Sequence, residues 1–199
     1  MSTRPLIYPL SSIEPLRTLV GSNDASLIDA IVDAFMASHR EDYGGPPPDA
    51  DSIEEIRVAA TAIASAKLPL DAEPGEWEYV LRYAAKALGL SKSLYPINED
   101  WKWMAWTEYR DEVGNRLPGA AGQQLGWLVD GRPLVGSRLE SRGSYYAWLE
   151  PSEVQSLLAA LEKLRDTDGE LDEEIDEFHV ALVDWLHQCE QRALLLTAS

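Results

Sequence analysis

The chain has few of the residues that most often carry chemistry, with one cysteine and three histidines among 199 residues. The single cysteine, Cys189, excludes an internal disulfide and is compatible with a reducing compartment. It falls on an apolar helical stripe, which favours a small buried side chain over a reactive thiolate. His179 and His187 would be rotated by about 80° from each other on a helix, so they do not converge on one ligand point. The sequence therefore predicts no metal site and no cofactor.

Motifs for phosphate binding and nucleophilic catalysis are also missing. Neither GxxxxGK[ST] nor GxGxxG occurs, and Ser22 and Ser137 lack the second glycine of a nucleophile elbow. General acid and base pairs stay open, because 34 carboxylates offer many combinations. The pair closest to the tryptophans is Glu108 and Asp111. The sequence assigns no catalytic residue and favours a protein that is not an enzyme.

Cations are scarce, since 17 Lys and Arg against 34 Asp and Glu give a formal net charge of −17. This charge argues against a nucleic-acid partner, whose phosphates require cationic neutralisation, and disfavours an anionic membrane. Nine carboxylates and no Lys or Arg lie between Asp166 and Asp184. The run is either a solvated helix face or a surface that steers a basic protein partner. The candidate interaction residues are Asp172, Glu173, Asp176 and Glu177.

Long apolar runs are absent as well. No stretch approaches the roughly 20 residues needed to cross a bilayer, and the N-terminus lacks the apolar core of a signal peptide. We therefore expect a soluble cytoplasmic protein. A length of 199 residues with 45% hydrophobic content fills one domain and is short for two.

Apolar stripes spaced three or four residues apart predict most of the helices. These helices begin near residues 24, 52, 74, 151 and 171. Ser22 or Asn23 is the expected N-cap of the first, and Ser52 with Glu55 forms a capping-box pattern for the second. Between these two helices, residues 43–51 predict an exposed Gly/Pro loop within the single domain.

Residues 98–113 fit neither period cleanly, because Trp101 and Trp103 alternate as in a strand while Trp103 and Trp106 are spaced as in a helix. Asn98 could cap a helix here, which favours the helix. Residues 111–126 contain several glycines and a proline and are expected to be a loop.

Five short segments are expected to form one small, mainly antiparallel sheet that joins the N- and C-terminal segments. They are residues 5–9, 127–129, 133–136, 145–149 and 193–197. The second and third would form a hairpin around Asp130-Gly131, and the prolines of the first place it at an edge. The predicted fold is α+β, with five or six helices packed on one side of the sheet.

Six of the seven tryptophans lie between residues 77 and 148. Aromatic side chains bury roughly 150 to 250 Å² each, so they could form the core and its rim. The alternative is an aromatic-walled groove for a sugar, peptide or planar ligand, with arginines at its mouth. The candidate ligand-binding residues are Trp101, Trp103, Trp106, Arg138, Arg142 and Tyr145.

The C-terminal third carries YYAWL at residues 145–149, PSEV at 151–154 and RALLL at 192–196, and this order resembles the YfbM-like bacterial proteins of unknown function. The start, IYPL at 7–10 followed by residues 16–24, resembles related uncharacterised families. The resemblance implies an α+β fold whose first and last segments share a small sheet, and it transfers no catalytic residue. With the charge and the missing motifs, it favours a non-enzymatic interaction or regulatory protein, for example of the immunity type. The alternative is a small-molecule-binding domain or hydrolase that uses the aromatic groove.

Overall fold

The computed structural model describes residues 5–43, 46–65, 75–91, 96–98, 101–132, 134, 145–167 and 171–198. Its strands are β1 (Pro5–Leu10), β2 (Tyr145–Leu149) and β3 (Ala193–Ala198). They form a sheet in the order β1-β3-β2, with both pairs antiparallel. The predicted strands at 5–9, 145–149 and 193–197 are confirmed, and so is the α+β fold in which the two ends of the chain share a sheet.

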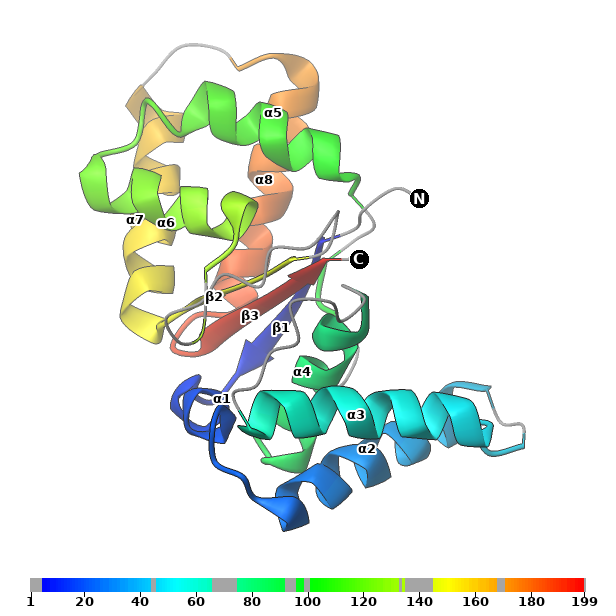
Figure 1. Cartoon of the computed structure of the whole chain (residues 1–199). Coiled ribbons are helices and arrows are strands. Elements are labelled where there is room, and N and C mark those ends of the chain that lie inside the picture. Colours follow the sequence, from blue (N-terminus) through cyan, green and yellow to red (C-terminus); the bar gives the residue numbers. More distant parts are fainter. Residues whose placement is uncertain are drawn as a thin grey trace.

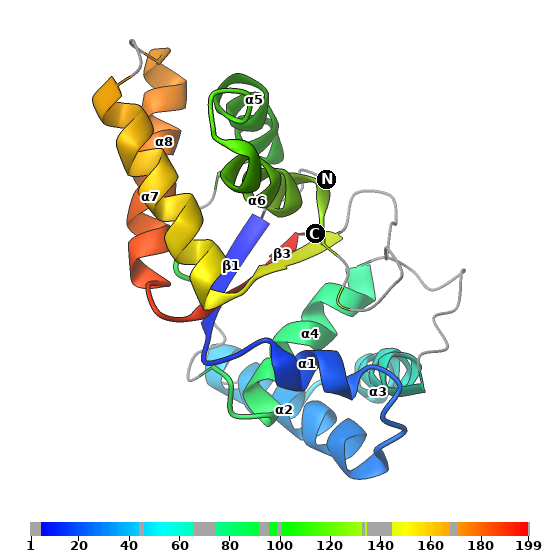
Figure 2. The same ribbon diagram turned by 90° about the vertical axis from the view of Figure 1, so that its left-hand side faces the viewer.

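Helices cover both faces of this sheet (Figures 1 and 2). Within the described residues they are α1 (Glu14–Leu19), α2 (Ala25–Tyr43), α3 (Ala50–Ser65), α4 (Gly75–Ala87), α5 (Trp103–Val113), α6 (Gly119–Asp130), α7 (Pro151–Thr167) and α8 (Glu173–Gln188). One face packs against α1 to α4 and the other against α5 to α8. The molecule thus has three layers, and the expectation that all helices lie on one side is wrong.

The two-sided packing follows from the composition of β3. Leu195 belongs to the core under α1 to α4, whereas Leu194 and Leu196 belong to the core under α5 to α8. All three leucines have 0% exposure. A strand buried on both faces reads as a continuous apolar run without alternation, which is the pattern of residues 193–196.

The open edge of β1 is covered by the segment that leads towards α5. The Ile97 amide donates to the Ile7 carbonyl (2.9 Å). The Asn98 side chain accepts from the Ile7 amide and donates to the Pro5 carbonyl, both at 2.7 Å. Pro5 and Pro9 have the same parity as Ile7, so their missing amides fall on this edge. The edge position predicted for β1 is confirmed, and Asn98 serves this edge instead of capping a helix.

Residues 127–129 lie in α6, so the predicted hairpin strand there is wrong, as is most of the predicted loop at 111–126. Leu134 is not in a strand, while 133, 135 and 136 lie outside the described residues. The Asp130-Gly131 pair ends a helix instead, because Gly131 has φ 86° and its amide donates to the Trp127 carbonyl. Gly122 made this helix resemble a loop in the sequence. The fold favours a glycine at this position, because a Cβ there would lie 3.0 Å from the Gly114 carbonyl oxygen.

Residues 103–113 are helical, as favoured within 98–113. Two predicted caps are displaced. Asp24 caps α2, since its Oδ1 accepts from the Ser26 and Leu27 amides (3.0 and 3.3 Å). Asp49 caps α3 by accepting from the Ser52 amide (2.8 Å), so the expected loop at 43–51 is shorter. Aspartate fits these positions because a negative charge is favourable at a helix N-terminus.

Candidate functional site

The start of α8 presents carboxylates to solvent. One side of this helix is buried and carries Ile175, Phe178, Leu182 and Trp185. The opposite side therefore faces solvent. Asp172 is the N-cap residue and Glu173, Glu174 and Asp176 lie in the first turn. Each of the four predicted interaction residues is exposed; they are Asp172, Glu173, Asp176 and Glu177. At about 100° per residue, Glu173, Asp176 and Glu177 project to one side of the helix.

These carboxylates have no ion-pair partner in the described part of the chain. Many of the arginines are used elsewhere. Ion pairs join Arg17 to Glu14 (3.3 Å), Arg57 to Asp29 (2.6 Å), Arg116 to Glu112 (3.2 Å), Arg132 to Glu153 (2.6 Å), and Arg110 to Asp111 (2.7 Å) and to Asp130. The helix dipole accounts for the carboxylates of the first turn, but Glu177 lies beyond it. The start of α8 is therefore a surface of one charge sign.

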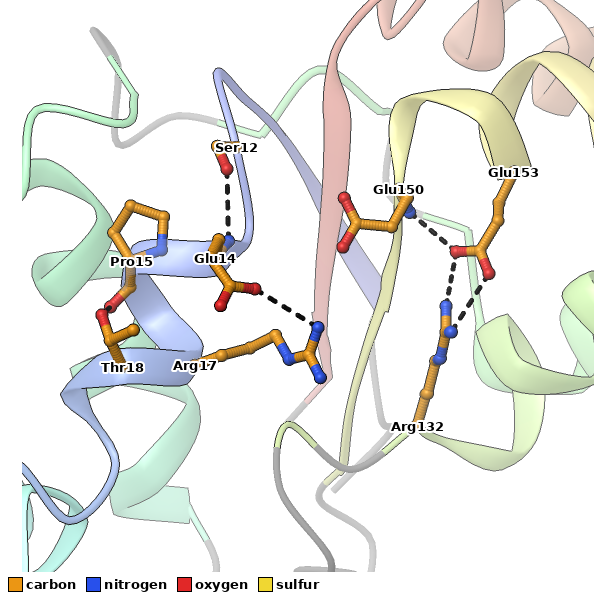
Figure 3. Close-up of polar contacts among 8 residues, drawn as sticks. All are labelled: Ser12, Glu14, Pro15, Arg17, Thr18, Arg132, Glu150 and Glu153. Carbon is orange, nitrogen blue, oxygen red and sulfur yellow. Dashed lines mark hydrogen bonds and ion pairs between the residues drawn. The ribbon is translucent and has the colours of Figure 1, made fainter.

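A second polar cluster surrounds Arg132, just after α6. Its guanidinium carbon lies 3.8 Å from the ring centroid of Trp127 and 3.5 Å from that of Trp148. The guanidinium also makes a two-pronged ion pair with Glu153, at 2.6 and 3.1 Å (Figure 3). The Arg132 amide donates to the Tyr146 carbonyl (3.0 Å) and its Nη1 to the Trp148 carbonyl (3.2 Å). Arg132 thus covers the open edge of β2, as Asn98 covers that of β1.

Glu153 extends this cluster to the start of α7, where its Oε2 accepts from the Glu150 amide (2.8 Å). The Glu150 carboxylate extends towards the side of the molecule on which α1 lies, and no contact joins it to Arg17 (Figure 3). Burial raises the pKa of Glu150. The negative charge of Glu153 raises this pKa further, whereas the positive charges of Arg17 and Arg132 lower it. A carboxyl with a raised pKa can act as an acid. The charged groups around it pair within their own layers, Arg17 with Glu14 and Arg132 with Glu153, and the Trp148 ring contacts both guanidiniums.

The predicted aromatic groove is only partly described. Trp106 has 0% exposure, stacks on Trp185 (6.1 Å between centroids, 21°) and meets the edge of Phe178 (5.1 Å). It belongs to the core under α5 to α8 and does not face a ligand. Trp101 is half-buried and also contacts Phe178 (5.3 Å). The side chains of Trp103 and Tyr145, and all of Arg138 and Arg142, lie outside the described residues.

The sequence did not indicate a buried pair between α5 and α8. The Tyr109 hydroxyl and the His179 Nδ1 are 2.6 Å apart, and both residues have 0% exposure. This bond satisfies polar atoms inside a core, where an unmade hydrogen bond is costly. The only local signal is the helical spacing of Trp106, Tyr109 and Val113, all buried. The pair is structural, because neither side chain reaches solvent.

Alkaline pH is expected to unfold the protein. Burial raises the pKa of Tyr8, Tyr109 and Tyr146 above 10.0 and that of Cys189 from 9.0 to about 12. The unfolded chain releases these protons first, so their contribution to stability is complete below about pH 9 and falls as the pH rises. Urea denaturation between roughly pH 8 and 11 should show this loss, with a shallower slope in Tyr109→Phe. A free energy of unfolding that stays constant over this range would contradict the prediction.

No protein-family model matches the chain, and neither a curated protein nor a solved structure matches it. The resemblance to the YfbM-like proteins therefore stays a prediction. In the described part of the chain, no helix is both long and apolar enough to cross a membrane. The same residues contain no group of three His, Cys, Asp or Glu side chains placed to hold a metal ion.

Proposed function

We propose that the chain is a non-enzymatic interaction protein of the bacterial cytoplasm that binds a basic protein through the start of α8. The observation that carries this proposal is a set of exposed carboxylates without an ion-pair partner in the described residues. A surface of one sign steers an oppositely charged partner and discriminates against partners of the same sign. The buried stripe of α8 holds these carboxylates on a rigid support.

A regulatory or immunity-type role fits this surface, because such proteins act by covering a partner. The alternative, a ligand groove walled by tryptophans, has less support, since Trp106 is fully buried. The relationship to the YfbM-like proteins is part of the proposal, and it adds no site residue.

The test variant combines Glu173→Gln, Asp176→Asn and Glu177→Gln, which removes three negative charges from the start of α8. A matched control neutralises three exposed carboxylates at the start of α3, namely Asp51→Asn, Glu54→Gln and Glu55→Gln. Affinity capture from a bacterial lysate at low salt should recover a basic protein that salt releases. The α8 variant should bind the captured protein at least about tenfold more weakly than the unmodified chain does, since each of three lost ion pairs contributes about 0.5 kcal/mol.

The control variant should bind the captured protein as the unmodified chain does. Titration calorimetry on the purified pair would measure the three affinities. The proposal fails if both variants bind equally well, or if no captured basic protein is released by salt.

A further inference from the structure

Five charged side chains gather where β2 ends and α7 begins (Figure 3). Arg17 of α1 pairs with Glu14 (3.3 Å), and Arg132 pairs with Glu153 (2.6 Å). The carboxylate of Glu150 makes no ion pair and accepts no hydrogen bond from the described residues. The cluster therefore holds three carboxylates and two guanidiniums, and Glu150 is the carboxylate without a counter-ion of its own.

The guanidinium of Arg132 is fixed in its present position. Its carbon lies 3.5 Å from the ring centroid of Trp148 and 3.8 Å from that of Trp127. Its two terminal nitrogens donate to Glu153 at 2.6 and 3.1 Å, and the Glu150 amide donates to the same carboxylate at 2.8 Å. Arg132 cannot turn to the Glu150 carboxylate without breaking these contacts. The carboxylate of Glu153 is thereby held close to that of Glu150, and like charges repel.

Helix α1 supplies one cation and one carboxylate on the other side of Glu150. The guanidinium carbon of Arg17 lies 5.4 Å from the ring centroid of Trp148, and its ion pair with Glu14 is largely exposed. The opposite charges of this pair partly cancel at Glu150. No element packed around Glu150 therefore provides a full counter-charge.

Glu150 is also partly buried, so its charge is incompletely hydrated, which is costly for a carboxylate without a partner. Burial raises the pKa of Glu150 most, and the charges of Glu153 and Glu14 raise it further, whereas Arg17 and Arg132 lower it. The folded chain consequently holds this proton more tightly than the unfolded chain does.

We propose that the junction of β2 and α7 is a proton-sensitive element of the fold, in which protonation of Glu150 leaves two balanced ion pairs and stabilises the folded chain in mild acid. This contribution is complete below the pKa of glutamate in the unfolded chain, about 4.3, and is lost as the pH rises through the pKa of the folded chain. A carboxylate that is paired in the folded state has the opposite effect, because it loses its partner in acid. The element does not depend on the proposed partner surface on α8.

The experiment compares Glu150→Gln with the unmodified chain by urea denaturation at several values between about pH 4 and pH 7. Glutamine imitates the protonated carboxyl, so the variant should unfold at a higher urea concentration than the unmodified chain at pH 7. The difference should shrink towards pH 4, because the unmodified chain then carries the proton as well. Glu108→Gln is the control, since Glu108 is an exposed carboxylate on α5 without an ion pair among the described residues. It measures how far the loss of any one charge stabilises a chain of net charge −17.

A titration of the side-chain carboxyl carbon of Glu150 by nuclear magnetic resonance follows the proton directly. Its midpoint should lie above that of glutamate in the unfolded chain. Glu153→Gln should shift this midpoint to lower pH, because it removes a repelling charge and leaves Arg132 without its partner. Arg17→Met should shift the midpoint to higher pH, because it removes an attracting charge. A purely structural role of these side chains would not produce shifts of opposite sign.

A midpoint of Glu150 at or below that of unfolded glutamate would overturn the proposal. So would a Glu150→Gln variant that is no more stable at pH 7 than the Glu108→Gln control. If Glu150→Gln does not fold, the titration of the unmodified chain decides alone.

Discussion

Replacing Arg132 by methionine is expected to lower the free energy of unfolding by about 3 kcal/mol. Methionine keeps much of the volume between Trp127 and Trp148 but removes the charge. The side chains of Arg132 and Glu153 are only 17% and 20% exposed, so the substitution leaves a largely buried carboxylate without its counter-ion. It also removes two cation–π contacts of roughly 0.5 to 1 kcal/mol each. Urea denaturation followed by far-UV circular dichroism would measure the loss.

Arg116 supplies the matched control for this prediction. It pairs with Glu112 one helical turn away, and their side chains are 34% and 28% exposed. Arg116→Met should therefore cost less than about 0.5 kcal/mol. A double-mutant cycle of Arg132→Met with Glu153→Gln should give a coupling of about 1 to 2 kcal/mol. Equal small losses at both arginines would show that the Arg132 cluster does not stabilise the fold.

The sequence predicted elements whose pattern is local. The stripe of α8 repeats over four turns, and the strand at 145–149 ends at a proline that begins α7, so both are readable without tertiary information. Helix α6 was not readable in this way, because its glycines resemble a loop. A glycine is favoured at position 122 because a larger side chain would crowd the Gly114 carbonyl. Only the folded chain shows this close approach.

The polar sites depend on contacts between distant segments. The sequence offered Arg138 and Arg142 as arginines beside the tryptophans and did not single out Arg132, whose stacking requires Trp127 from α6 and Trp148 from β2. Tyr109 and His179 likewise come from α5 and α8. The exposed carboxylates of α8 were predictable, since a run of one charge opposite an apolar stripe has one solvent-facing arrangement.

Alanine substitutions in β3 give the second large effect. Leu195 and Leu196 are adjacent in sequence, fully buried, and packed in opposite cores. Leu195→Ala and Leu196→Ala should each cost about 3 kcal/mol, from lost burial and the cavity left behind. Val58, which is 52% exposed on α3, provides the control, and Val58→Ala should cost less than about 0.5 kcal/mol. If either alanine substitution leaves the free energy of unfolding nearly unchanged, helices do not cover the corresponding face of the sheet.

The two β3 variants also test whether the layers unfold together. Trp106 and Trp185 lie in the core under α5 to α8, so tryptophan fluorescence reports strongly on that layer, while circular dichroism reports on all helices. Successive residues of β3 belong to alternate cores. If β3 unfolds together with one helical layer, its side chains therefore also leave the core of the other layer. Both signals should therefore follow one transition in the unmodified chain and in each variant. Two separate transitions, with Leu195→Ala lowering only one of them and Leu196→Ala only the other, would mean that the layers are independent units.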